Sequence, residues 1–187
     1  MSSRDLVDPP NSTALVTSTW ALVKKKFDMD DVGMMIYDEM FRLDPTLPDT
    51  LFKGVDQRGQ SHLLMLMIDG AVGMLTRNPI QLYHDLVKLG ERHAGYGVVY
   101  KHYPMTGQAV MNVLGRALGP DVMTPDTVAA WGTVYGVIQA AMLEGATTPK
   151  GKELAADYRR MHETPFPWGP IAVGVACVAL AVAVFKK

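Results

Sequence analysis

Apolar residues recur every three or four positions along most of this 187-residue chain, which is the spacing of one face of an α-helix. One such stripe, in the segment 126–145, contains Val128, Trp131, Val134, Tyr135 and Ile138. No stretch alternates between apolar and polar residues for long enough to predict a strand. The pattern therefore predicts an all-α domain of about seven helices.

Capping residues and prolines mark where several of these helices should begin. Asn78-Pro79 and Thr124-Pro125 each place a side-chain acceptor directly before a proline, a residue favoured in the first turn of a helix. The expected helices cover residues 14–27, 32–43, 58–76, 79–93, 104–118 and 126–145, with a short turn of helix at 45–48. A further polar helix over 149–162 should follow, as a juxtamembrane surface helix or as a solvated connector with a few packed residues.

The chain ends in a long apolar run, which has no charged residue over 164–185. About 20 apolar residues at a rise of 1.5 Å cross a hydrocarbon core of ~30 Å, and Trp168 and the final Lys186-Lys187 suit the two interfaces. We therefore expect a single C-terminal transmembrane helix over residues 166–187, in contact with membrane lipid. A buried terminal helix of the globular domain is the alternative.

Four parts of the chain are expected from these patterns: an N-terminal extension (1–11), a helical domain (12–147), a connector (148–165) and a membrane anchor (166–187). The formal net charge of −1 does not suggest nucleic-acid binding, and a single cysteine excludes an intrachain disulfide or a cysteine-based zinc site. The N-terminus lacks the apolar core of a secretory signal. We expect the domain to face the cytoplasm at the cell membrane.

One histidine stands out among the five that could bind a metal, which are His62, His84, His93, His102 and His162. His93 shares a helical face with Leu86 and Leu89 at spacings of three and four, whereas His84 is turned away from that face. A haem iron with one protein ligand needs a neutral imidazole on a rigid helix. By itself, a histidine in such a position is more often a packed residue than a ligand.

Four short motifs accompany this histidine. Leucine follows glutamine by four residues in Gln60-Ser-His-Leu-Leu64, and Tyr103-Pro104 begins ten residues after His93. The other two are Ile36-Tyr37-Asp-Glu-Met-Phe41 with Leu51-Phe52, and Ala130-Trp131-Gly-Thr-Val-Tyr135. Together they resemble the bacterial single-domain globins, which are related to the globin domain of flavohaemoglobins. The resemblance covers residues 12–144 and implies a globin fold in which helix D is absent.

On the proximal side, the resemblance implies that His93 ligates the iron of a haem b. Phe52, Leu64, Leu89 and Tyr103 would then contact the haem. Some members of the family also place a glutamate in the proximal pocket, but the corresponding position here is Ala146, which puts a strongly anionic proximal histidine in doubt.

On the distal side, the resemblance makes Tyr37 and Gln60 hydrogen-bond donors to a bound O₂, NO or CO molecule, with Leu64 as their apolar cover. Each donor would stabilise the ligand by roughly 1–3 kcal/mol. Ordinary helix packing is the alternative for Tyr37 and Phe52. His62 lies about 200° around the helix from Gln60 and should face away from the iron, whereas a shifted register would make it a sixth ligand.

The resemblance implies a haem protein that reversibly binds O₂ and supplies or buffers it at the membrane. Nitric oxide dioxygenase activity is an alternative that needs a separate reductase, because Gly95-Tyr-Gly97 lacks the third glycine of a dinucleotide-binding motif. A haem-based gas or redox sensor and a haem-free helical adaptor are further alternatives. Paired alanines in the tail could also support a homodimer.

Overall fold

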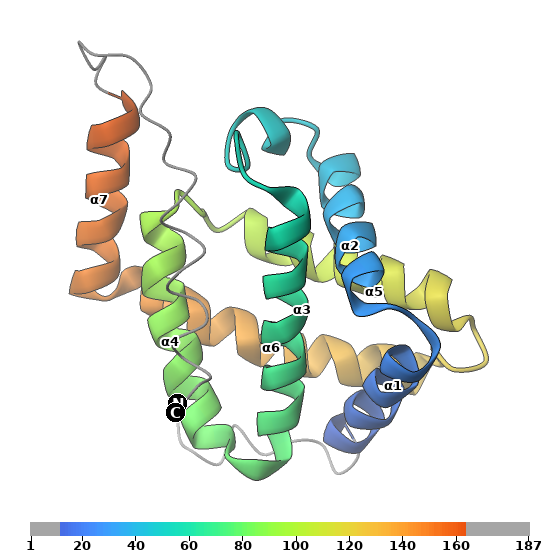
Figure 1. The fold of residues 1–187 in the computed structure, drawn as a ribbon. Helices are drawn as coiled ribbons and strands as arrows, with labels where there is room; N and C mark the ends of the chain where they lie inside the picture. Colours follow the sequence, from blue (N-terminus) through green and yellow to red (C-terminus); the bar gives the residue numbers. More distant parts are fainter. Residues whose placement is uncertain (1–11, 164–187) are drawn as a thin grey trace.

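The computed structural model describes residues 12–163, which fold into α-helices joined by short turns (Figure 1). The elements are α1 (Ser12–Lys26), α2 (Met29–Leu43), the 3-10 helix η1 (Leu47–Asp49), α3 (Gln57–Arg77), α4 (Pro79–Gly95), α5 (His102–Leu118), α6 (Pro125–Thr147) and α7 (Pro149–Glu163). These residues contain no strand, so the all-α prediction is confirmed for this part of the chain. Residues 50–56 contain no helix, and 50–54 form turns, at the place where the expected fold lacks helix D.

The expected fold class is wrong in its last element, the transmembrane helix. Over residues 12–163, no helix is both long enough and apolar enough to span a bilayer. Residues 12–163 therefore form an all-α arrangement of seven α-helices, none of which could span a membrane. The segment 166–187, to which the span was assigned, lies outside the described residues.

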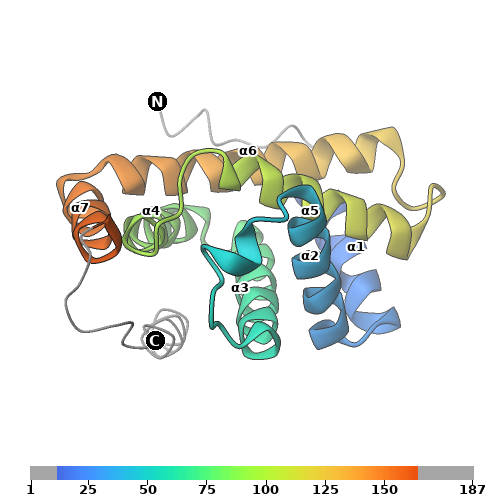
Figure 2. The same ribbon diagram turned by 90° about the horizontal axis from the view of Figure 1, so that it is seen from above.

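The long helix α6 runs along one side of the molecule, and α1, α4, α5 and α7 pack against it (Figure 2). Helix α5 lies on the same side as α6, and α2 and α3 lie below these two helices in this view. Helices α4 and α7 lie side by side at the far end of α6 in both views (Figures 1 and 2). Helix α3 packs mainly against α2 and also contacts α1 and α4.

The main hydrophobic core joins α1, α2, α3, α5 and α6 through buried side chains that include Val16, Trp20, Ile36, Met65, Val113 and Trp131. The rings of Trp20 and Trp131 meet edge to face, with centroids 6.1 Å apart. The indole of Trp131 donates to Thr19 Oγ1 at 2.9 Å, so its polar group is satisfied inside the core. Val128 was predicted to share this face but is 44% exposed.

A second cluster fixes α4 on α6 through Leu82, Leu86, Leu89, Tyr103, Ala141 and Met142. The two backbones touch where these helices cross. A Cβ atom at Gly90 would lie 1.9 Å from the carbonyl oxygen of Met142, and one at Gly145 would lie 1.9 Å from that of Val87. Only glycine permits this approach, which holds the two helices in a close crossing.

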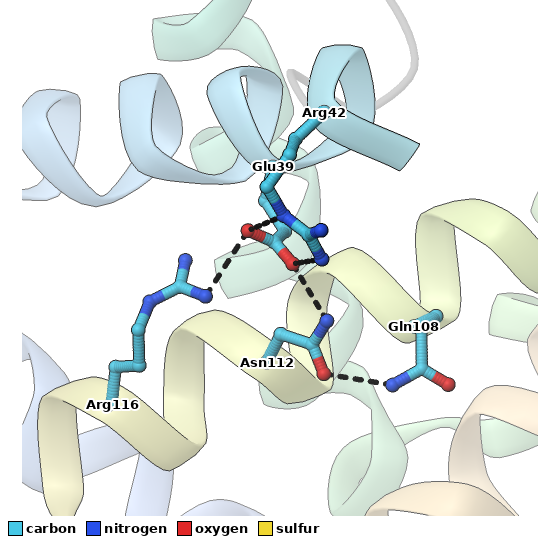
Figure 3. A network of polar contacts seen from close by, with 5 residues as sticks. All are labelled: Glu39, Arg42, Gln108, Asn112 and Arg116. Atoms are coloured by element: carbon cyan, nitrogen blue, oxygen red, sulfur yellow. Dashed lines mark hydrogen bonds and ion pairs between the residues drawn. The ribbon is translucent and has the colours of Figure 1, made fainter. Parts of the chain in front are cut away.

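A buried carboxylate joins α2 to α5 away from both clusters (Figure 3). Glu39 accepts hydrogen bonds from Arg42 at 2.8 and 3.1 Å, from Asn112 at 2.6 Å and from Arg116 at 3.1 Å. Gln108 donates to the amide oxygen of Asn112 at 2.7 Å. Arg42 first, and then Asn112 and Arg116, lower the pKa of Glu39 to about 2, so the buried group is an anion with its lone pairs satisfied.

Candidate functional site

A cavity of about 280 Å³ lies within the fold, lined by residues from α2 to α6. Its walls are mostly apolar side chains, as in pockets that bury an organic ligand. Every residue that the sequence analysis assigned to a site lines this cavity: Tyr37, Phe52, Gln60, Leu64, Leu89, His93 and Tyr103. The fold thus brings together residues that are up to 66 positions apart in the printed sequence.

His93 lies in the last turn of α4 and lines the cavity. Its Nδ1 atom is 3.0 Å from the carbonyl oxygen of Leu89. Because a carbonyl only accepts, Nδ1 carries the proton and Nε2 is left with a free lone pair. Burial lowers the pKa of His93 to about 4, which keeps the ring neutral at pH 7. His84, on the same helix, is exposed, as its position in the apolar pattern predicted.

Tyr37 and Gln60 approach the cavity from α2 and α3. Burial raises the pKa of Tyr37 far above its ordinary value, and the side chain of Gln60 opposes this rise to a smaller extent. The phenol is therefore protonated and can donate a hydrogen bond. The Oε1 atom of Gln60 is buried and has no hydrogen-bond partner among the described residues.

Three aromatic rings pack edge to face on this side of the cavity. The ring centroid of Tyr37 is 5.3 Å from that of Phe52 and 5.9 Å from that of Phe41, and the two phenylalanine rings are 5.6 Å apart. Phe52 belongs to the turns between η1 and α3. Its contacts with α2 hold these turns against the cavity, because edge-to-face aromatic pairs are favourable.

Tyr103, near the start of α5, presents a second unpartnered polar atom. Its hydroxyl is buried without a hydrogen-bond partner among the described residues, and burial raises the pKa of Tyr103 to about 12. Its backbone carbonyl accepts a 2.6 Å hydrogen bond from the hydroxyl of Tyr135 on α6. Buried polar groups normally have partners, so two orphaned atoms in cavity-lining residues indicate space meant for a ligand.

His62 does not line the cavity. Its side chain is exposed, and Nδ1 lies 2.7 Å from Oδ1 of Asp30 on α2. The helix thus turns His62 away from the site, in the direction expected from its spacing to Gln60. The shifted register that would have made it a sixth ligand is not the register of this structure.

Glu144 also lies outside the cavity, where its carboxylate accepts a 2.6 Å hydrogen bond from the hydroxyl of Tyr83. The partner of the His93 ring is therefore the Leu89 carbonyl rather than a carboxylate. A neutral acceptor gives the imidazole less anionic character than a carboxylate would.

The sequence analysis did not assign several cavity-lining residues to the site. They are Ile68, Ala71 and Leu75 on α3, Met142 on α6, and the polar Arg92 and His102. The three on α3 continue the face of Leu64 at spacings of four, three and four, so helical periodicity could have found them. Arg92 gave no such signal, because polar residues are usually assigned to the solvent. His102 was one of the five histidines considered as metal ligands, but no pattern placed it beside His93.

Comparisons with known proteins bear on this site. A family model described as Globin matches residues 35–142. The chain is 28% identical over 155 residues to flavohemoproteins from two strains of Xylella fastidiosa, a match that covers 76% of this chain and 36% of each relative. It is 30% identical over 127 residues to neuroglobin of Danio rerio, which covers 60% of this chain and 77% of that protein.

The matched segment 35–142 contains all seven candidate residues. The chain spans about a third of the length of the flavohemoproteins that it matches. Helix α7 lies after the segment that the family model matches.

Proposed function

The chain belongs to the globin family, and on that premise we propose that it holds a haem b in the cavity and reversibly binds O₂ there. Membership of the family implies haem binding. The observation that carries the assignment to this cavity is the state of His93, whose Nδ1 proton is held by the Leu89 carbonyl and whose ring is neutral. That leaves Nε2 as an imidazole ligand for iron.

The remaining lining residues fit a flat apolar group with a polar edge. Phe52, Leu64, Leu89 and Tyr103 would contact the haem, and the two orphaned atoms on Gln60 and Tyr103 offer hydrogen-bonding capacity that the protein leaves unused. A bound haem would supply an iron that can bind a diatomic gas.

Tyr37 and Gln60 would act on the gas ligand. The raised pKa of Tyr37 keeps its proton in place at neutral pH, so the hydroxyl can donate. Hydrogen bonds in a dry apolar cavity are stronger than in water, and each would stabilise a partly negative ligand by roughly 1–3 kcal/mol. Leu64 and Phe52 line the same space with apolar surface.

Visible spectra of the purified chain test this proposal. We expect a Soret band after haem addition, a change on reduction, and distinct spectra with O₂ and with CO. His93→Gly should lose the normal spectrum and regain it with added imidazole, because the small molecule can take the place of the missing ring. His84→Gly, on the exposed face of the same helix, is the matched control and should retain the wild-type spectrum. An unchanged spectrum in His93→Gly would overturn the ligand assignment.

Nitric oxide dioxygenase activity with a separate reductase is a second candidate, favoured by the similarity to the flavohemoproteins. Tyr37 and Gln60 would serve it equally well. The test is the yield of nitrate from NO in air, with the haem-loaded chain and an added flavin reductase. Nitrate formation that does not exceed the rate without the chain would exclude this activity.

A further inference from the structure

Helix α7 turns back after α6 and packs against α4, the helix that carries His93 (Figures 1 and 2). Its residues lie outside the segment matched by the family model. The sequence analysis left it as a surface helix or a solvated connector. Its contacts with α4 suggest a more specific role.

The start of α7 is tied to α4 by a hydrogen bond. Thr148 Oγ1 donates to the carboxylate of Glu91 at 2.8 Å and accepts from the backbone N–H of Gly151 at 3.0 Å. A Cβ atom at Gly151 would lie 2.3 Å from the carbonyl oxygen of Gly145, so the turn from α6 into α7 is tight. This turn fixes the direction in which α7 leaves α6.

Two side chains of α7 pack against Gly95 and Gly97, at the C-terminal end of α4. A Cβ atom at Gly95 would lie 3.1 Å from Cβ of Leu154. At Gly97 it would lie 2.4 to 2.7 Å from atoms of the Tyr158 ring. Gly97 has a φ of 84°, a backbone conformation that residues with a side chain rarely adopt. The Tyr158 ring is also stacked on His162, with centroids 4.1 Å apart.

The segment beneath Tyr158 is bonded directly to His93. The backbone N–H groups of Tyr96 and Val98 both donate to the carbonyl oxygen of His93, each at 3.0 Å. The ring centroid of Tyr96 lies 5.9 Å from that of His93, and both residues line the cavity. A contact on Gly97 is therefore a contact on the backbone that closes the last turn of α4.

We propose that α7 positions His93, with Tyr158 over Gly97 and Leu154 against Gly95 holding the C-terminal turn of α4. Tyr158 and Leu154 are positioning residues, since they act on the ring through the backbone of residues 95–98. The consequence for iron rests on the proposed function. The bracing of α4 does not depend on haem.

The first test uses hydrogen exchange in the full chain without haem. Tyr158→Ala should speed exchange of the Tyr96 and Val98 amides by about tenfold, equivalent to about 1.4 kcal/mol of local opening. Tyr158→Phe keeps the ring and should exchange like the wild type. Arg159→Ala, at the exposed neighbouring position, is the matched control. If Tyr158→Ala does not fold, Tyr158→Leu replaces it, and the same direction of change is expected.

The second test uses resonance Raman spectra of the ferrous haem-loaded variants. The iron–histidine band should shift or broaden in Tyr158→Ala, and Tyr158→Phe should restore it. Unchanged exchange rates in Tyr158→Ala would overturn the proposal, and so would faster exchange with an unchanged band. If the wild-type chain binds no haem, the proposed function fails by itself, and the exchange rates alone then support or overturn the bracing of α4.

Discussion

Tyr37 shows how burial sets the chemistry of a single residue in this cavity. Its ring packs against those of Phe41 and Phe52, and burial strongly disfavours ionisation and raises the pKa, while the side chain of Gln60 opposes the rise to a smaller extent. Apolar neighbours cannot accept a hydrogen bond from the hydroxyl. A tyrosine held in this way is a permanent donor across the physiological pH range.

Tyr37→Phe should therefore raise the rate of O₂ dissociation by about tenfold, if a hydrogen bond of about 1.4 kcal/mol is lost. Stopped-flow mixing of the O₂ complex with excess CO measures this rate. Tyr83→Phe removes a tyrosine hydroxyl that is bonded to Glu144 outside the cavity, and this control should leave the rate unchanged. Equal rates in wild type, Tyr37→Phe and Gln60→Ala would mean that neither distal group touches the ligand.

Glu39 predicts a pH dependence of stability. Its pKa is lowered from 4.5 to about 2 in the folded chain, chiefly by Arg42, so the unfolded chain binds the proton more readily. The stabilisation is fully present above about pH 4.5 and is lost as the pH falls towards 2. Glu39→Gln should lower the free energy of unfolding by about 1–3 kcal/mol at pH 7, because it leaves the arginines without an anion.

This difference between wild type and Glu39→Gln should shrink steadily between pH 4.5 and pH 2. Urea unfolding at several pH values measures it. Glu153→Gln, at an exposed position on α7, is the matched control. A difference for Glu39→Gln that stays constant down to pH 2 would contradict the low pKa.

At the scale of elements, the crossing of α4 and α6 depends on glycine. Gly90→Ala places a methyl group where the Met142 carbonyl already lies, so we expect a loss of about 1–3 kcal/mol in the free energy of unfolding. Gly132→Ala, on the exposed face of α6, has no described atom within 4 Å of its new Cβ and should gain up to about 1 kcal/mol. Thermal unfolding of both variants compares them, and equal melting temperatures would contradict the close crossing.

Helix boundaries could be predicted where a single local signal decides them. Asn78 and Thr124 cap α4 and α6 through their side chains. Helix α4 begins at Pro79, as expected, and α6 begins at Pro125, one residue before the expected start. Helix α2 begins three residues earlier than expected, because Asp28 caps it by accepting from the amides of Asp30 and Asp31. Three aspartates so close together can all cap a helix, and only the packing of its first turn selects one.

Seven residues that line the cavity could be named from the sequence. Helical spacing pointed to Gln60 with Leu64 and to Leu89 with His93, whereas Tyr37, Phe52 and Tyr103 came from the resemblance to globins. What the sequence could not show was the tertiary partner of α7. Leu154 and Tyr158 stand on a largely polar helix, where the apolar pattern is weak. Their contacts are possible because Gly95 and Gly97 have no side chain. The sequence of α7 does not indicate which glycines elsewhere in the chain its side chains will pack against.

At the scale of the whole molecule, α3 and α4 both line the cavity, and these two walls have unequal support. Helix α3 belongs to the main core, whereas α4 is held by α6 and α7. Removing haem should therefore increase hydrogen exchange more in α4 than in α1 or α5, since a ligand stabilises what it contacts. Exchange measured by mass spectrometry in loaded and haem-free protein tests this, and a uniform increase would contradict it.

The pair of tryptophans in the main core gives the molecule a built-in optical reporter. Trp131 lines the cavity, and its ring lies 6.1 Å from that of Trp20. Both indoles are thus close enough to pass their excitation to a coloured guest in the cavity, which would quench their emission. Trp168→Phe removes the remaining indole of the sequence, so titration of this variant would read out cavity occupancy from fluorescence alone, without any attached label.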